Sequence, residues 1–371
     1  MVSKLFILSG LLFVFSCQQP DKQESVADLP IDEGEVVIDT QMVEYLFPPG
    51  KDILTGGDGA ISIPIDHTKI DHTKSFWIWG DSFLGEVNDN QRAESSPFIM
   101  GNVWQLLDGE SVKTITGGSI KKPESLLKTE SVDGYPAVLW PMHGFVKNNI
   151  GHVFMSTIVQ TGTGAWDFYW HSTVYYRLNL PDLSIIDKQE LLTREQTNAH
   201  FGFGVTEHDG FYYIYGSNPQ EDFTAGLHVA RARLVNDKLQ NWEYFDNNNW
   251  ATNAKESKPL EGIDIPVSEQ FSVFKHEDKF ILLTQDRFRP DIYTFIADTP
   301  VGPWTNKNNI YKIPEGEDTT LFTYNAMAHP QYGPEDKLLV SYCVNAKHIP
   351  DLYTDVSIYR PRFFWISINI R

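Results

Sequence analysis

Short runs of apolar and aromatic residues alternate with polar turns along most of this 371-residue chain. In the clearest repeat, an apolar run is followed by a turn rich in Asn, Asp, Gly or Lys, and then by a second run that carries more aromatic residues. Runs of about four to eight such residues between turn signals are typical of antiparallel β-strands. Five strand pairs are expected, at 60–65 with 75–80, 144–146 with 152–158, 203–206 with 211–215, 271–274 with 279–284, and 326–330 with 337–344.

This repeat predicts an all-β protein. A run at 363–368 would complete the last unit. Five units of about 65 residues, each with three or four antiparallel strands, form the pattern of a β-propeller, in which every unit is one blade around a central axis. We therefore predict a single five-bladed β-propeller over residues 45–371, with an irregular pair of β-sandwiches as the alternative. Third strands are expected at 173–177, 226–230 and 291–295.

The N-terminal residues have the pattern of an export signal. Lys4 precedes an apolar run at 5–15, which is too short to span a bilayer, and Ser16-Cys17 follows it. We predict a lipoprotein signal peptide at 1–16, lipidation of Cys17 and a flexible tether at 17–44. The mature protein would then be exported and anchored in a membrane by its lipid, in the periplasm or at the cell surface. An ordinary cleaved signal with an incidental Cys17 is the alternative.

Cys343 is the only cysteine in the predicted domain, so no disulfide can form within it. It lies in the apolar run 338–344, where we expect a buried and unreactive thiol. The apolar core must therefore stabilise the domain without a covalent cross-link.

Charge and composition restrict the class of partner. A formal net charge of −19 argues against binding nucleic acid or anionic lipid directly. Aromatic residues make up 13% of the chain, and flat rings suit the faces of sugars, although aromatics are also common in strands of any function. We expect a monomer whose partner is a glycan and which meets the membrane only through its lipid.

A carboxylate at the end of a hydrophobic strand is the first candidate for chemistry. The run Phe76–Phe83 reads as a buried strand until Gly80, and Asp81 follows that glycine directly. Burying an ionised carboxylate is costly unless it is paired, hydrogen-bonded or used. Asp58, between glycines ahead of the partner strand, is the best placed second acid. Two carboxylates flanking one bond are what glycoside hydrolysis requires, so we predict Asp58 and Asp81 as a catalytic pair.

Polar and aromatic residues ahead of the other repeat strands would converge at the same end of a propeller axis. Glu269 could instead pair with an arginine, and each histidine could be a hydrogen-bonded structural residue. No cofactor is required and no metal ligands are assigned, although a structural calcium or other ion at the axis is left open. The predicted substrate-binding residues are Trp79, Trp140, His143, His200, Phe203, Glu269, Gln270, Asn325, His329 and Arg362.

Several short motifs together resemble a known group of proteins. They are Gly57-Asp58-Gly59, Trp79–Phe83, Tyr324–Pro330, Leu339–Asn345 and Tyr359–Phe363. They are similar to motifs of exported bacterial five-bladed propellers of the DUF4185 and DUF5005 type. That group looks related to endo-D-arabinanases, and more distantly to the family 43 and 62 glycoside hydrolases. The resemblance implies that Asp58 and Asp81 match the two first-blade aspartates implicated in the arabinanases.

Three functions are consistent with these features. The first is a glycoside hydrolase acting on a furanoside-containing or related neutral glycan. The second is a non-catalytic glycan-binding surface lipoprotein. The third is an esterase with Ser82 as nucleophile, because Gly80-Asp81-Ser82 resembles the nucleophile block of such enzymes. An esterase of that kind requires helices between its strands and a late Asp-x-x-His, and the sequence offers neither.

Overall fold

The computed structural model describes residues 36–51, 53–65, 74–109, 111–164, 166–220, 224–287, 289–334 and 336–368. These residues form antiparallel sheets with few and short helices, which confirms the predicted all-β class. The predicted signal peptide, Cys17 and most of the predicted tether lie outside the described residues. No helix in the described ranges is long and apolar enough to cross a membrane. The helices are α1 (Gln41–Leu46), α2 (Asp351–Thr354), and the 3-10 turns η1 (Ala254–Glu256), η2 (Pro314–Glu317) and η3 (Val356–Tyr359).

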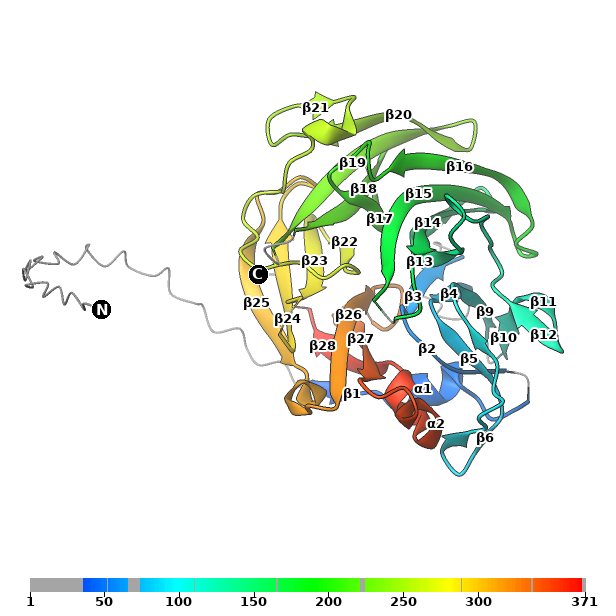
Figure 1. Cartoon of the computed structure of the whole chain (residues 1–371). Helices are drawn as coiled ribbons and strands as arrows, with labels where there is room; N and C mark the ends of the chain where they lie inside the picture. The colour runs from blue at the N-terminus through cyan, green and yellow to red at the C-terminus, as the bar shows by residue number, and fades with distance from the viewer. Residues whose placement is uncertain are drawn as a thin grey trace, which may run out of the picture. The chain divides into compact units, whose positions relative to one another are not determined.

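Five antiparallel sheets of four or five strands make up most of the described chain, and they follow one another in chain order (Figure 1). The first holds β3 (Ile61–Pro64), β4 (Lys74–Trp79), β9 (Val103–Asp108) and β10 (Ser111–Ile115). The second holds β13 (Ala137–Lys147), β14 (Ile150–Gln160), β15 (Phe168–Asn179) and β16 (Ile185–Thr193). The third holds β17 (His200–His208), β18 (Phe211–Pro219), β19 (Ala225–Val235), β20 (Lys238–Phe245) and β21 (Trp250–Ala251).

The fourth sheet holds β22 (Ser272–His276), β23 (Lys279–Gln285), β24 (Asp291–Ala297) and β25 (Thr305–Lys312). The fifth combines β26 (Leu321–His329), β27 (Lys337–Ala346) and β28 (Arg362–Ser367) with β1 (Val37–Ile38) from the other end of the described chain. Smaller sheets are β2 (Ile53–Gly57) with β5 (Ser82–Gly85) and β8 (Phe98–Ile99), β6 (Val87–Asn88) with β7 (Gln91–Arg92), and β11 (Gly117–Ser119) with β12 (Lys122–Glu124). The five strand pairs predicted from the sequence are confirmed as β3–β4, β13–β14, β17–β18, β22–β23 and β26–β27.

Consecutive sheets pack through shared apolar clusters, and the first and last sheets also share one. Burial on both faces explains why the inner strands read as nearly continuous apolar runs rather than as alternating ones. The hydroxyl of Ser62 on β3 and Nδ1 of His329 on β26 lie 2.7 Å apart, which joins the first sheet to the fifth. Pairs that belong to one cluster are Ile78 with Met155, Phe154 with Ile214, Tyr215 with Phe280, Leu283 with Val340, and Trp77 with Leu339.

The segment at 37–46 corrects the predicted boundary of the tether, which was placed at 44. Strand β1 pairs antiparallel with β28, and Asp39 accepts a hydrogen bond from the Trp365 indole at 2.8 Å. Helix α1 buries Met42 and Leu46 against the first and fifth sheets. Polar composition predicted a tether here. An edge strand can still form from polar residues, because it is held by hydrogen bonds between its backbone and a partner strand.

Cys343 lies on β27 with its thiol buried, as the sequence predicts. Burial raises the pKa of this thiol far above its usual range, so the reactive thiolate is disfavoured.

Replacing Leu46 with Ala tests whether this N-terminal segment is part of the folded domain. Leu46 is fully buried, so Leu46→Ala should lower the free energy of unfolding by about 2–5 kcal/mol, through lost burial and the cavity left behind. Val37→Ala is the matched control, because Val37 is 45% exposed and its loss should change stability by less than about 0.5 kcal/mol. Chemical denaturation measures both. Equal effects of the two substitutions would mean that α1 does not pack as described.

Candidate active site

Asp58 and Asp81 lie in a gap between two ladders of paired strands, β2–β5 and β3–β4. Gly57 pairs with Ser82 on one side of the break, and Ile61 pairs with Ile78 on the other. Across it, the Asp58 amide donates to the Asp81 carbonyl at 3.3 Å, and the Gly80 amide donates to the Asp58 carbonyl at 2.8 Å. The unchanged register across this gap places Asp58 opposite Asp81. It brings the two predicted acids together.

Gly80 is required by the close approach of Asp58. A Cβ atom built at Gly80 would collide with Oδ1 of Asp58, so any side chain there would displace the carboxylate. On the other strand Ala60 has a φ of 48°, a left-handed conformation that is uncommon for a residue with a side chain. Strained positions of this kind persist where the surrounding structure holds them, and they cluster at functional sites.

Two tyrosines from the C-terminal part of the chain donate hydrogen bonds to Asp58. The Tyr324 hydroxyl lies 2.9 Å from Oδ2 of Asp58, and the Tyr359 hydroxyl also donates to this carboxylate. Asn345 lies 3.5 Å from the Tyr324 hydroxyl and helps to orient it. Donors aimed at a carboxylate favour its ionised form. Asp58 is thus held as an acceptor by groups from the fifth sheet and η3.

Asp81 has a different set of donors, and both reach the same oxygen. The Trp140 indole donates to Oδ1 at 3.0 Å, and the Gly101 amide donates to Oδ1 at 2.8 Å. Within the described part of the chain no hydrogen bond reaches Oδ2. That oxygen is therefore the one able to carry a proton and to donate it to a ligand.

Burial raises the pKa of both carboxyl groups above the ordinary value of 3.8. Each residue is half-buried, enclosed by protein on most sides yet still reachable by solvent. The pKa of Asp58 rises to about 6, because lost solvation outweighs the hydrogen bonds from the two tyrosines. The pKa of Asp81 rises to about 7, first through burial and then through the nearby charge of Asp58. Interacting carboxyl groups titrate as a pair, and this pair holds about one proton near neutral pH.

A register shift occurs in the first strand of three other sheets. It skips 142–143 in β13, 202–203 in β17 and 325–326 in β26. His143, Phe203 and Asn325, all predicted site residues, lie in these irregularities, and Asn325 has a left-handed φ of 55°. Their side chains therefore leave the ladder at comparable places in the fold.

Gln270 and His143 present polar atoms that the described residues leave unsatisfied. The Gln270 side chain donates to the Pro141 carbonyl at 3.2 Å, which links the fourth sheet to the second. Its Oε1 is buried without a hydrogen-bond partner in the described structure, as is Nδ1 of His143. Burial lowers the pKa of His143 to about 4, so its ring is neutral at physiological pH. Neutral groups of this kind can accept or donate to ligand hydroxyls.

Trp79 and His329 are corrections to the predicted substrate-binding set. Trp79 is fully buried, stacks on Trp77 and donates its indole N–H to Gln105 at 3.0 Å. His329 is also fully buried, with one ring nitrogen near Ser62 and the other 2.8 Å from Ser341. Neither side chain has surface or polar capacity left for a ligand, so both stabilise the core instead.

The structure does not bring the remaining predicted residues onto the carboxylates. His200 is buried 4.0 Å from the Trp170 ring and 2.9 Å from Ser156, and burial lowers its pKa to about 3. Phe203 packs edge-on against His200. The other two pair with charges that the sequence alone did not identify: Glu269 lies 3.8 Å from Arg287, and Arg362 lies 3.1 Å from Glu315.

The donors to Asp58 are the functional candidates that sequence reasoning missed. Tyr324 precedes the predicted Asn325, and Tyr359 begins the motif in which only Arg362 was selected. Aromatic residues next to selected positions were the available signal. The partner of Tyr324 lies 266 residues away, which no local pattern reveals.

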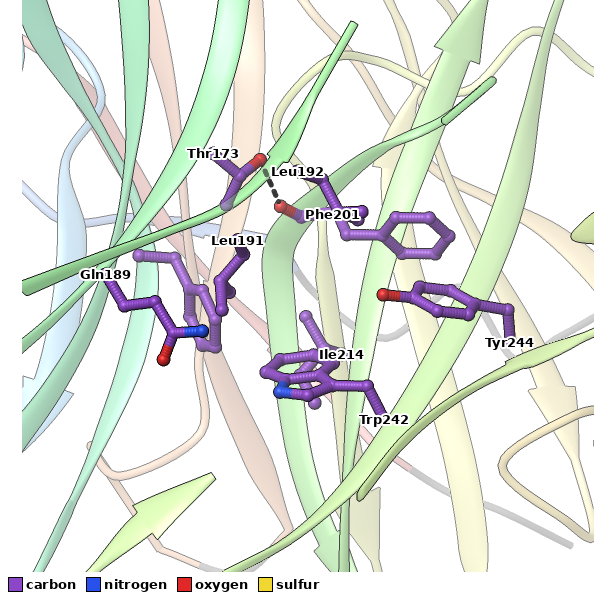
Figure 2. Close-up of a pocket in the computed structure, with 9 residues that line it drawn as sticks. Thr173, Gln189, Leu191, Leu192, Phe201, Ile214, Trp242 and Tyr244 are labelled. Carbon is purple, nitrogen blue, oxygen red and sulfur yellow. Dashed lines mark hydrogen bonds between the residues drawn. The ribbon is translucent and has the colours of Figure 1, made fainter. Parts of the chain in front are cut away.

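A cavity of about 100 Å³ lies elsewhere, between the second and third sheets. Figure 2 shows that Trp242 and Tyr244 face Gln189 and Leu191 across it. Neither acid nor any predicted site residue lines this cavity, so we assign it to imperfect packing between sheets. Among the residues described, no group of three or more His, Cys, Asp or Glu side chains could hold a metal ion.

Comparisons with known proteins identify a family and show a shared fold. The family described as "Domain of unknown function (DUF5005)" matches residues 47–368. No curated protein matches the sequence. A Bacteroides ovatus ATCC 8483 protein described as a "putative hydrolase" is similar over 94% of this chain and 97% of its own, at 17% identity and a TM-score of 0.71. The similarity to it shows the fold alone.

A second solved structure, the xylan β-1,4-xylosidase of Bacillus halodurans C-125, is similar over 88% of this chain at 8% identity and a TM-score of 0.52. This chain covers 55% of that enzyme, about half of its length. The similarity again concerns the architecture and not the chemistry.

The electrostatic coupling of the two acids predicts how one responds to loss of the other. Asp58→Asn removes a like charge, which makes ionisation of Asp81 easier, so the pKa of Asp81 should fall by about one pH unit. Carbon-13 NMR of labelled aspartate carboxyls across pH 4–9 measures it, with Asp278→Asn, an 80% exposed residue, as control. An Asp81 titration that does not move in Asp58→Asn would show that the acids do not interact.

Proposed function

The chain belongs to the DUF5005 family, and we propose that it is a glycoside hydrolase that uses Asp58 and Asp81 as its acid pair. One observation carries this proposal. Two half-buried carboxyl groups lie at a shared break in the strands, and their surroundings keep about one proton on the pair near neutral pH. Glycoside hydrolysis needs one protonated and one ionised carboxyl at the same bond.

The two environments suggest different roles for the acids. No hydrogen bond within the described residues reaches Oδ2 of Asp81, and burial together with the charge of Asp58 raises its pKa, which suits the general acid that protonates the leaving oxygen. Asp58 has the lower pKa and accepts from two tyrosine hydroxyls, which suits the ionised partner. That partner would act as nucleophile or as base for a water molecule. When Asp81 gives up its proton, the Trp140 and Gly101 donors stabilise the new charge.

We also propose that the five sheets are the blades of a five-bladed propeller, with the acids at one end of its axis. The apolar clusters shared by consecutive sheets, and by the first and last, support this arrangement. The repeated irregularity of the inner strands supports a site to which several blades contribute. Binding sites at the mouth of closed β-architectures are common.

The proposed substrate is a neutral, furanoside-containing or related glycan. The net charge of −19 would repel a polyanionic substrate. The xylosidase with a similar fold acts on a neutral polysaccharide by its name, and the sequence motifs resemble those of endo-D-arabinanases. D-arabinan is thus one of the substrates to test.

The proposed location follows from the N-terminal sequence. The chain would be exported and held at a membrane by acylation of Cys17, as a monomer that meets its glycan outside the cytoplasm. Labelling with a palmitate analogue, compared between the wild type and Cys17→Ser, would test that anchor.

Asparagine substitutions at the two acids test the proposed reaction. Asp58→Asn and Asp81→Asn should each lower kcat/KM by about 10²–10⁴, because each removes a group that transfers a proton or attacks the sugar. Reducing-sugar release from a panel of plant, fungal and bacterial glycans, D-arabinan included, identifies the substrate and then measures both variants.

Ser82→Ala is the matched control for this experiment. Its hydroxyl is buried and donates to the Gly80 carbonyl at 2.9 Å, so turnover of the glycan should stay close to that of the wild type. Loss of glycan cleavage in Ser82→Ala, with both asparagine variants active, would contradict the acid pair. Binding without cleavage of every glycan in the panel would favour a glycan-binding lipoprotein.

A further inference from the structure

Trp166 is an exposed aromatic residue on the β14–β15 hairpin. Its side chain is 76% exposed, although indole rings usually bury most of their surface. The turn that carries it is held by hydrogen bonds: the Thr161 amide donates to the Asp167 carbonyl at 2.7 Å, and the Gly164 amide donates to Oδ2 of Asp167 at 2.8 Å. A single exposed ring is common on protein surfaces, so the neighbours of Trp166 decide whether it belongs to a binding surface.

Trp166 is the middle of a continuous series of rings. On one side it lies 6.3 Å from Phe168, which in turn lies 4.9 Å from Trp140. On the other side it lies 6.4 Å from Phe322, which stacks on Tyr324 at 5.4 Å. These centroid distances are those of interacting aromatic pairs. We call the five residues the aromatic arc.

Both ends of the aromatic arc terminate on the acid pair. Trp140 donates to Asp81, and Tyr324 donates to Asp58. The aromatic arc thus begins at Asp81, passes from the second sheet to the fifth through Trp166, and ends at Asp58. Its members other than Trp166 are all half-buried residues.

From this geometry we propose that the aromatic arc is a carbohydrate-binding wall, in which Trp166 stacks on a sugar ring outside the bond that is cleaved. This proposal rests on the proposed function, because it takes the acid pair as the point of cleavage. The C–H bonds on one face of a sugar ring are apolar and present positive hydrogens, which suit the negative face of an indole. A purely apolar ligand would offer nothing to Oδ2 of Asp81, which no hydrogen bond within the described residues reaches, whereas a sugar hydroxyl can bond to it.

The position of Trp166 in the arc implies a dependence on chain length. Trp140 and Tyr324 contact the acids directly, so their rings would border the sugars on either side of the cleaved bond. Trp166 is separated from each acid by two rings, so only a longer oligosaccharide would reach it. Trp166 would therefore set how many sugar units the protein recognises.

Binding to a variant that cannot cleave tests the arc separately from the chemistry. In the Asp81→Asn background, arabinofuranosyl and xylosyl oligosaccharides of two to six units would be titrated by calorimetry. Adding Trp166→Ala should weaken binding of the longest oligosaccharides by about tenfold, the upper range for one aromatic contact, and leave disaccharides unchanged. Trp166→Phe should restore most of the affinity, because a phenyl ring can still stack.

Ile120→Ala is the matched control, because Ile120 is 79% exposed and lies outside the arc. Equal affinities of Trp166→Ala and Ile120→Ala at every chain length would overturn the arc, as would absence of binding by all oligosaccharides. Failure of the wild type to cleave any glycan, together with binding that depends on Trp166, would overturn hydrolysis and keep the arc. Cleavage of a glycan by the wild type, with binding that does not change in Trp166→Ala, would overturn the arc and keep hydrolysis.

Discussion

The repulsion between two half-buried carboxylates is the constraint on which the rest of this site depends. Burial and like charge make ionisation of both groups harder, so their pKa values rise from 3.8 to about 6 and about 7. Hydrogen-bond donors on both acids, among them the Tyr324 and Tyr359 hydroxyls on Asp58 and the Trp140 indole and Gly101 amide on Asp81, offset part of this cost. The break in the strands and the absence of a side chain at Gly80 follow from the same need to hold Asp58 close to Asp81.

The fold meets this constraint by drawing on distant parts of the chain. Asp58 lies between β2 and β3, and Asp81 lies between β4 and β5. The indole comes from the second sheet, and one tyrosine each comes from the fifth sheet and η3. Register shifts in β13, β17 and β26 turn further side chains out of the ladder in other sheets. Regular sheets can thus carry a site made of irregular segments, in which residues such as Ala60 and Asn325 adopt strained, left-handed backbone conformations.

Local sequence patterns predicted much of this arrangement, and their failures have clear physical reasons. Strand pairs were predictable because apolar runs and turn residues are adjacent in sequence. Asp58 and Asp81 were predictable because a carboxylate after an apolar strand is unusual wherever it occurs. Trp79 was misassigned because side chains two apart on a strand share a face, so it points into the core with Trp77. Contacts such as Tyr324 with Asp58 or Trp166 with Phe322 depend on how sheets meet, which no local pattern contains.

The pH dependence of kcat/KM on the best glycan substrate tests the central claim most directly, because it reports the ionisation of the free protein. If one acid must be protonated and the other ionised, the profile is bell-shaped, with an acidic limb near pH 6 and an alkaline limb near pH 7 that belong to the pair as a whole. A profile that stays flat from pH 5 to pH 8 would contradict the account, since the shared proton would then have no part in the reaction.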